Sequence, residues 1–232
     1  MFSGFCPNPP LLGCANIRLA TLPKGVLFDR DVATTARYGK PDIKPPSEVA
    51  MLSSFDPEYA PVGDIGTALL YVDSLLTRIR EGVSQAAPQQ RELIDEFFGS
   101  FSSKDAGDVL DGACTLVYLY MEWLRQAHEE QDRDVVESVV PYVIGSMRKM
   151  TVSVRPEAIP AMAGMLTASA IGLSPTLWRK QYGPWTEAEM NALEATLVLL
   201  ADYINHLTND ETMAIHMIAD IMESMEQADD RG

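Results

Sequence analysis

The stretch from Asp105 to Gln131 constrains the fold more than any other part of the chain. Between Val109 and Leu124 apolar residues fall on every side of a helical wheel, whereas a surface helix shows a single apolar stripe. A helix of this length measures about 40 Å, since each residue adds about 1.5 Å. We therefore expect a buried helix around which the domain packs, with a solvated polar end near His128.

The composition describes an acidic globular chain. The 232 residues suit one large domain or two small ones, and 47% of them are hydrophobic. Eighteen basic residues stand against 33 acidic ones, which gives a net charge of −15. Such a surface repels a phosphate backbone, so we expect no direct binding to nucleic acid.

The charge is unevenly distributed along the chain. Residues 1–46 hold six basic and three acidic residues, a net charge of +3, which leaves −18 for the remainder. From Thr186 to Asp230 there is no Lys or Arg. A basic arm therefore precedes an acidic body, and we expect the arm to pack on acidic helices of its own subunit or of a partner.

Residues 1–60 contain many prolines and no helical period, which predicts an extended N-terminal arm. The stretch Ile17 to Phe28 places Pro23, Lys24 and Gly25 between two short apolar runs and could form a small hairpin. Residues 61–232 then form the predicted helical domain.

The remainder of the chain shows the periodicity and caps of helices. Pro141 should kink or split one of them, while Thr186 and Glu189 form a capping box for another. Gly164, Ala168 and Gly172 stand four residues apart and predict a close approach of another backbone. The fold class is thus an all-α, single-domain bundle of seven to eight helices, with expected ranges of 64–83, 88–98, 105–131, 134–152, 156–171, 174–178, 186–207 and 210–227.

The cysteine content and one uncharged stretch of the sequence bear on cellular location. The chain has three cysteines, Cys6, Cys14 and Cys114. This number is small and odd, which does not suit a disulfide framework, so we expect a reducing, cytoplasmic setting. The uncharged stretch between Glu157 and Arg179 has the length of a membrane span, but its Pro, Gly and small residues favour a buried helix. No membrane association is expected.

One candidate metal site involves the last two predicted helices. Asp202 and His206 are one helical turn apart, as are His216 and Asp220, and two imidazoles with two carboxylates could bind a divalent ion such as zinc. On a helical wheel, however, both pairs lie away from the apolar stripes. The alternative is that both pairs are solvated.

A second candidate is a carboxylate cluster at the start of the long helix. Asp105, Asp108 and Asp111 recur every three residues, and carboxylates on neighbouring helices hold magnesium in some all-α hydrolases. Acidic residues in a first turn also complement the helix dipole without any further function.

The last predicted helix carries an apolar face rich in methionine, including Met213 and Met217. Together with Cys114 these side chains could line a pocket for a small apolar ligand, because methionine adapts its shape. The alternative is that they fill the core.

The function best supported by the sequence is a non-enzymatic interaction or structural module that forms a homodimer and could meet a basic protein partner. It rests on the charge asymmetry and on the lack of a nucleophile elbow, phosphate loop or dinucleotide motif. No cofactor is expected. The alternatives are a metal-dependent hydrolase and a binder of an apolar ligand, and the first of these would need a divalent metal.

Overall fold

The computed structural model describes residues 63–81 and 103–229. The predicted N-terminal arm, its hairpin and the predicted helix over residues 88–98 lie outside these ranges. Within the described residues there are seven α-helices, one short 3-10 helix and no strand, so the all-α prediction is confirmed. The elements are α2 (Ile65–Arg80), α4 (Ser103–Glu129), α5 (Val135–Lys149), η2 (Pro156–Ala158), α6 (Ile159–Ala170), α7 (Pro175–Lys180), α8 (Glu187–Thr208) and α9 (Met213–Asp229).

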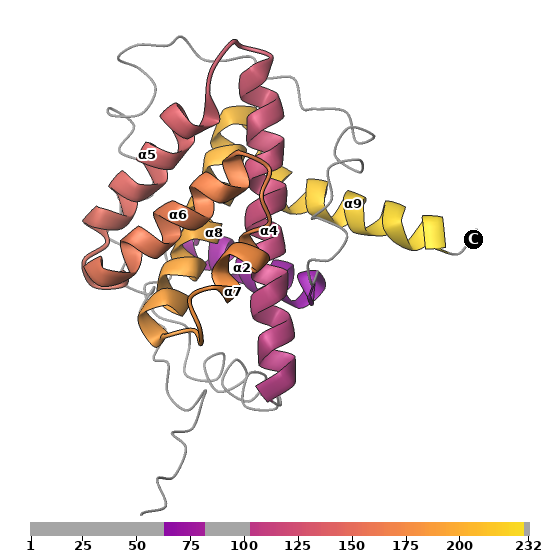
Figure 1. Ribbon diagram of the computed structural model, residues 1–232. Coiled ribbons are helices and arrows are strands. Elements are labelled where there is room, and N and C mark those ends of the chain that lie inside the picture. Colours follow the sequence, from indigo (N-terminus) through magenta and orange to yellow (C-terminus); the bar gives the residue numbers. More distant parts are fainter. Residues whose placement is uncertain (1–62, 82–102, 230–232) are drawn as a thin grey trace, which may run out of the picture.

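Helix α4 runs through the bundle as expected, and the other helices pack around it (Figure 1). Every residue from Gly112 to Leu124 is buried, because α2, α5, α6, α7 and α8 all contact this helix. Trp123 and Tyr120 are its largest fully buried side chains. An apolar surface on all sides of a helix therefore corresponds to neighbours on all sides.

The start of α2 crosses α4 at unusually short range. Gly63 adopts a left-handed φ of 68°, and the Asp64 amide donates a hydrogen bond of 2.8 Å to the Asp108 carbonyl. A Cβ atom at Gly112 would overlap the carbonyl oxygen of Asp64. Only a residue without a side chain allows the two backbones to approach this closely.

Local sequence signals set the ends of α8. Thr186 and Glu189 form the predicted capping box, in which each side chain bonds to the other residue's backbone amide. At the other end Asn209 adopts a left-handed φ of 56°. The Asn205 side chain then accepts from the Ala214 amide at 2.8 Å and fixes the turn into α9.

Pro141 does not split its helix, so that part of the prediction is wrong. Helix α5 runs without a break from Val135 to Lys149, with Pro141 on its exposed side. Asp134 caps its start by accepting from the Val136 amide at 2.7 Å. A proline on the solvated side loses one helical hydrogen bond, whereas the buried side still packs on the core.

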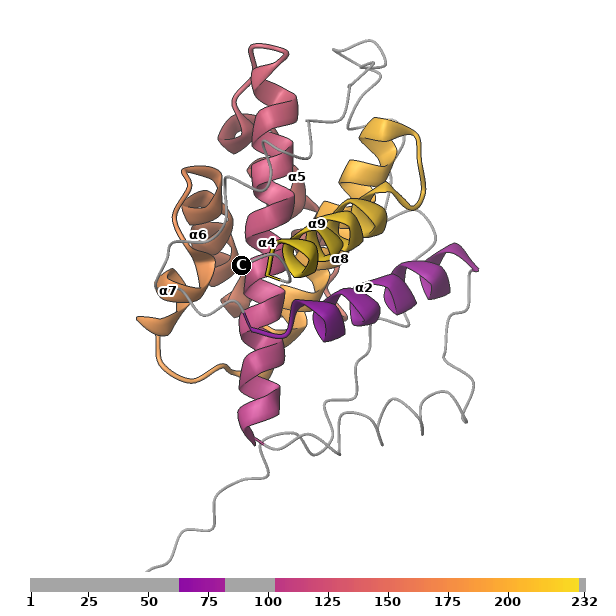
Figure 2. The ribbon, with the colours of Figure 1, turned by 90° about the vertical axis from the view of Figure 1, so that its right-hand side faces the viewer.

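Helix α9 follows α8 and extends away from the bundle, so that its C-terminal part projects from the body of the molecule (Figures 1 and 2). Along the described stretches of chain, no helix combines the length and the apolar character needed to cross a membrane.

Candidate functional site

The uncharged stretch, for which we expected two helical ranges at 156–171 and 174–178, forms α6, a tight turn and part of α7. Gly164 faces the indole of Trp178, and a Cβ atom there would overlap the ring at Cζ2. Gly172, by contrast, has open space around it. The predicted approach of another backbone along Gly164 and Gly172 is therefore wrong, because an aromatic side chain of α7 occupies the space beside Gly164.

Gly172 instead ends α6. It has a left-handed φ of 80°, and the Leu173 amide donates to the Ala168 carbonyl at 2.9 Å. A hydrogen bond of 3.0 Å from the Gly172 amide to the Ser169 carbonyl completes a Schellman motif. Ser174 then caps α7 by accepting from the Leu177 amide. Local hydrogen bonds therefore fix the conformation of the turn between α6 and α7.

A buried arginine holds α7 against the start of α8. The Arg179 guanidinium donates to the Gly183 and Pro184 carbonyls at 3.0 and 3.3 Å and lies 4.2 Å from the centre of the Trp185 ring. It also forms an ion pair of 2.8 Å with Glu189. Partial burial by itself would raise the pKa of Glu189. The hydrogen bonds from Thr186 and the charge of Arg179 outweigh burial, so the pKa of Glu189 is lowered.

With its inner side fixed, this segment presents large apolar side chains to solvent. Their exposed fractions are 63% for Ile171, 53% for Leu173, 39% for Leu177 and 58% for Tyr182. We call these four residues the α6–α7 surface. Lys180, the exposed charged residue of this segment, forms an ion pair of 3.7 Å with the Asp111 carboxylate. This surface was not predicted from the sequence, because we took the lack of charge between Glu157 and Arg179 as a sign of burial.

The predicted carboxylate cluster is only partly described. Asp105 lies on α4 but its side chain is outside the described set, Asp108 is exposed, and Asp111 is half-buried beside Lys180. Burial raises the pKa of Asp111, Lys180 opposes the shift, and the negative charge of Asp108 adds to it. The position of Asp111 is thus explained by an ion pair between α4 and α7.

The predicted metal residues on α8 and α9 do not come together. His206, His216 and Asp220 are exposed, as the helical wheel indicated, whereas Asp202 is half-buried. Among the side chains that the structure describes, no three His, Cys, Asp or Glu residues gather into a group that could hold a metal ion.

The expectation that Asp202 faces water needs correction. One of its carboxylate oxygens is buried without a hydrogen-bond partner. Burial raises the pKa of Asp202 to about 6, against the opposing effect of Arg80. A helical wheel considers only the apolar stripe of one helix, whereas α8 has neighbours on several sides, including α2 and α5.

The methionine face of α9 divides between core and surface. Met217 is buried, Met213 and Met222 pack partly buried against the core, and Met225 is exposed. Cys114 is buried on α4. Met217 and Cys114 are therefore part of the core, which was the alternative to a ligand pocket.

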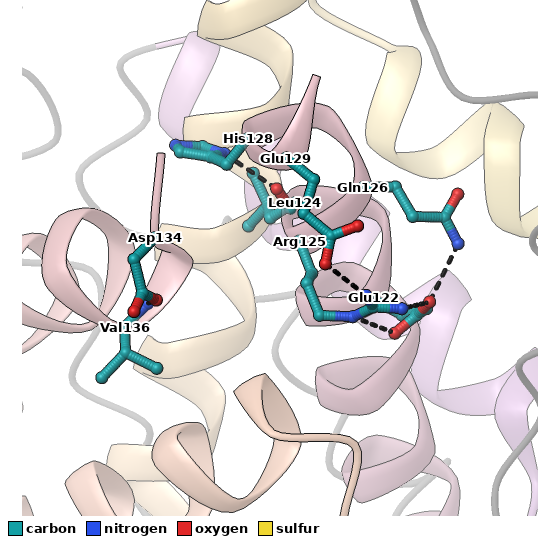
Figure 3. Close-up of polar contacts among 8 residues, drawn as sticks. All are labelled: Glu122, Leu124, Arg125, Gln126, His128, Glu129, Asp134 and Val136. Atoms are coloured by element: carbon teal, nitrogen blue, oxygen red, sulfur yellow. Dashed lines mark hydrogen bonds and ion pairs between the residues drawn. The ribbon is translucent and has the colours of Figure 1, made fainter. Parts of the chain in front are cut away.

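The C-terminal end of α4 is only in part the solvated end that we expected from the sequence, since Glu129 and Glu130 are exposed but His128 is not. His128 is buried, and its Nδ1 donates to the Leu124 carbonyl at 2.8 Å (Figure 3). Its ring stacks on Tyr203, with centroids 6.3 Å apart. Burial lowers the pKa of His128, although the bond to Leu124 opposes the shift. The neutral form is therefore favoured in the folded protein.

Six residues earlier, α4 buries a charged residue. Glu122 is almost fully buried and forms a two-point ion pair with Arg125, while the Gln126 amide donates to the same carboxylate at 2.9 Å (Figure 3). Arg125 also reaches Glu129. Arg125 and Gln126 together supply three hydrogen bonds to this buried carboxylate.

A further buried carboxyl group was missed. Glu194 lies on α8 within an otherwise apolar run and contacts Tyr71 of α2, with Arg78 nearby. Burial raises the pKa of Glu194 to about 8, although the Tyr71 hydrogen bond and the Arg78 charge oppose the shift. The sequence signal for this burial is that Glu194 is the single charged residue in the run from Ala192 to Ala201.

Comparisons with known proteins identify no relative: no protein-family model, no curated protein and no solved structure matches this chain.

Proposed function

We propose that this protein is a non-enzymatic interaction module that forms a homodimer through the α6–α7 surface. The observation that carries the proposal is a group of exposed apolar side chains without an unpaired charge, on a chain of net charge −15. Exposed apolar groups of this kind are typical of protein contacts.

Electrostatics favours this surface for contact with a second copy. In a two-fold dimer the same patch meets itself, so each charge in the patch lies close to an identical charge. Most of the surface of this chain would bring carboxylates together, since acidic residues outnumber basic ones by 15. The run from Ala158 to Trp178 contains no charged residue and avoids this repulsion.

The rigidity of α7 also supports the proposal. Arg179 holds the helix to the start of α8, and Gly164 allows Trp178 to lie against α6. Leu177 and Tyr182 are therefore held in place before a partner binds. A preformed contact surface loses less conformational entropy on association than a mobile one.

The test is the molar mass of the full-length protein in solution, measured by light scattering. We expect a mass of twice 25.5 kDa for the natural chain. Replacement of both Ile171→Glu and Leu177→Glu should give the monomer mass, because each interface would then bury four carboxylates.

The matched control is Val152→Glu, since Val152 is 61% exposed and lies in the turn before η2, outside the α6–α7 surface. This variant should remain a dimer. A dimer that survives the double replacement would exclude the α6–α7 surface as its interface, and a natural chain of monomer mass would exclude the dimer itself.

We also propose a reducing, cytoplasmic environment for this module. The small and odd number of cysteines, three in 232 residues, supports this.

A further inference from the structure

The connection from α5 to α6 concentrates positive charge on an acidic chain. Residues 148–157 contain three basic residues and one acidic residue, whereas the whole chain has a net charge of −15. Arg148 and Lys149 end α5, Arg155 immediately precedes η2, and all three are exposed. In the view of Figure 1 this connection lies at the edge of the bundle opposite α9. An anion that approaches this edge therefore meets a local positive charge.

The fold does not use these three basic side chains in ion pairs. Among the side chains that the structure describes, Arg148, Lys149 and Arg155 have no carboxylate as an ion-pair partner. By contrast, both basic residues of α7 form ion pairs. The three charges are therefore available to a ligand.

The helix dipole accounts for two of these residues but not for the third. Positive side chains in the last turn of α5 complement the partial negative charge there, which explains Arg148 and Lys149. Arg155 stands at the opposite kind of end, because it is the N-cap of η2 and α6 follows directly. A cation at a helix start is unfavourable, and the Arg155 side chain makes no capping hydrogen bond. Local helix stability therefore does not explain Arg155.

The turn between these residues holds them in a fixed arrangement. The Met150 carbonyl accepts hydrogen bonds from the Ser153 and Val154 amides, at 3.0 and 2.8 Å. Met150 and Val154 are buried, which anchors both ends of the turn in the core. Lys149 and Arg155 each lie one residue outside this closed turn, so their Cα atoms are at most about 14 Å apart.

An apolar side chain lies between the charges. Val152, in the middle of the turn, is 61% exposed. We call Arg148, Lys149, Val152 and Arg155 the α5–η2 surface. An extended peptide of about four residues spans about 14 Å and can place carboxylates on either side of an apolar side chain.

Other anions fit the α5–η2 surface less well. A nucleic acid or an anionic membrane is larger than this surface, so it would also meet the acidic remainder of the chain. A small anion such as phosphate has no apolar group to contact Val152.

We propose that the α5–η2 surface binds a short acidic segment of a partner protein, with carboxylates against the three basic residues and an apolar side chain against Val152. The turn is fixed before binding, so this side of the contact loses little conformational entropy. Helix α6, about 18 Å long, separates the turn from Ile171 of the α6–α7 surface. The proposal therefore does not depend on the α6–α7 dimer.

The test is a titration of the isotope-labelled full-length protein with the capped peptide Glu-Glu-Leu-Glu-Glu, followed by NMR. We expect the amide signals of residues 148–155 to shift, with a dissociation constant of about 1 mM at low salt, because exposed ion pairs are individually weak. Addition of about 0.5 M salt should weaken binding about tenfold. The uncharged peptide Gln-Gln-Leu-Gln-Gln is the control ligand and should cause no shift.

A charge-removing variant tests the basic residues directly. Arg148→Gln combined with Arg155→Gln should weaken binding about tenfold, since two ion pairs are lost. The matched control is Arg80→Gln combined with Lys180→Gln, which removes the same charge from exposed positions elsewhere. The control should bind the acidic peptide as the natural chain does.

Two variants already described separate this proposal from the dimer. Val152→Glu should abolish peptide binding, because it adds a carboxylate in the middle of the surface, and should leave the dimer mass unchanged. The chain with Ile171→Glu and Leu177→Glu should bind the peptide normally although its mass is that of a monomer. Failure of one proposal can thus be distinguished from failure of the other.

Three results would overturn the proposal. The first is the lack of any shift for residues 148–155 with the acidic peptide. The second is equal binding by the Arg148 and Arg155 variant and by its matched control. The third is an equal effect of inorganic phosphate at the same concentration, because a general anion site needs no apolar contact.

Discussion

Burial determines the protonation of two carboxyl groups that α8 carries into the interior. It raises the pKa of Glu194 to about 8 and that of Asp202 to about 6, even though Arg78 and Arg80 respectively oppose the shifts. Each group has one buried carboxylate oxygen without a hydrogen-bond partner. A buried ionised carboxylate without enough partners is costly, so burial shifts both groups toward the neutral form, and Glu194 further than Asp202.

Replacement of Glu194→Gln should change how stability depends on pH. Because the folded pKa of about 8 exceeds the ordinary value of 4.5, the folded state binds more protons than the unfolded state between these pH values. Glu194 therefore lowers stability as the pH rises from 4.5 to 8. The variant should be more stable than the natural chain at pH 8 by a few kcal/mol, since each pKa unit corresponds to about 1.4 kcal/mol.

Urea denaturation at several pH values from 5 to 8 measures this effect. Glu187→Gln, at an exposed position of the same helix, is the control and should leave the pH dependence of unfolding unchanged. If the natural chain and Glu194→Gln lose stability equally between pH 5 and 8, the explanation based on Glu194 is incorrect.

Gly112 provides a second prediction at the residue scale. Gly112→Ala should destabilise the fold by about 2 kcal/mol or more, because the added methyl group overlaps the Asp64 backbone, which cannot move aside as a side chain can. Gly145→Ala is the matched control, since Gly145 lies inside α5 with open space around it. That change should instead stabilise the protein by about 0.5–1 kcal/mol. Thermal unfolding of both variants checks the opposite signs.

At the scale of single helices, the sequence predicted those features that depend on neighbouring residues. The capping box of α8 and the Asp64 cap of α2 are examples, because a cap needs only one side chain and a nearby backbone amide. The burial of His128 and Asp202 could not be predicted from neighbouring residues in the sequence. Each depends on helices far away in the sequence, as the stacking of His128 on Tyr203 illustrates.

Arg179→Lys tests the connection between α7 and α8. Lysine keeps the positive charge but lacks the planar guanidinium group. That group lies over the Trp185 ring and donates hydrogen bonds to the Gly183 and Pro184 carbonyls and to the Glu189 carboxylate. We expect a loss of about 2 kcal/mol in unfolding free energy. Arg148→Lys, exposed on α5, should have no effect. Equal stability of both variants in urea would mean that the Arg179 contacts contribute little.

At the scale of the whole molecule, α4 and the overall charge could be predicted, whereas the α6–α7 surface could not. A helix that is apolar on every side must be surrounded, and α4 is. An uncharged segment can be either buried or exposed, and here α6 is mostly buried while Ile171 and Leu173 are not. The two exposed residues flank Gly172 in the Schellman turn between α6 and α7.

The most direct test of the proposed dimer is sedimentation equilibrium of the natural full-length chain at low and high salt. An interface made of uncharged apolar side chains should persist or strengthen at about 1 M NaCl, because salt screens the repulsion between two chains of charge −15. The account predicts a dimer at both salt concentrations, with an equal or lower dissociation constant at high salt. A monomer under both conditions, or a dimer that dissociates when salt is added, would contradict it.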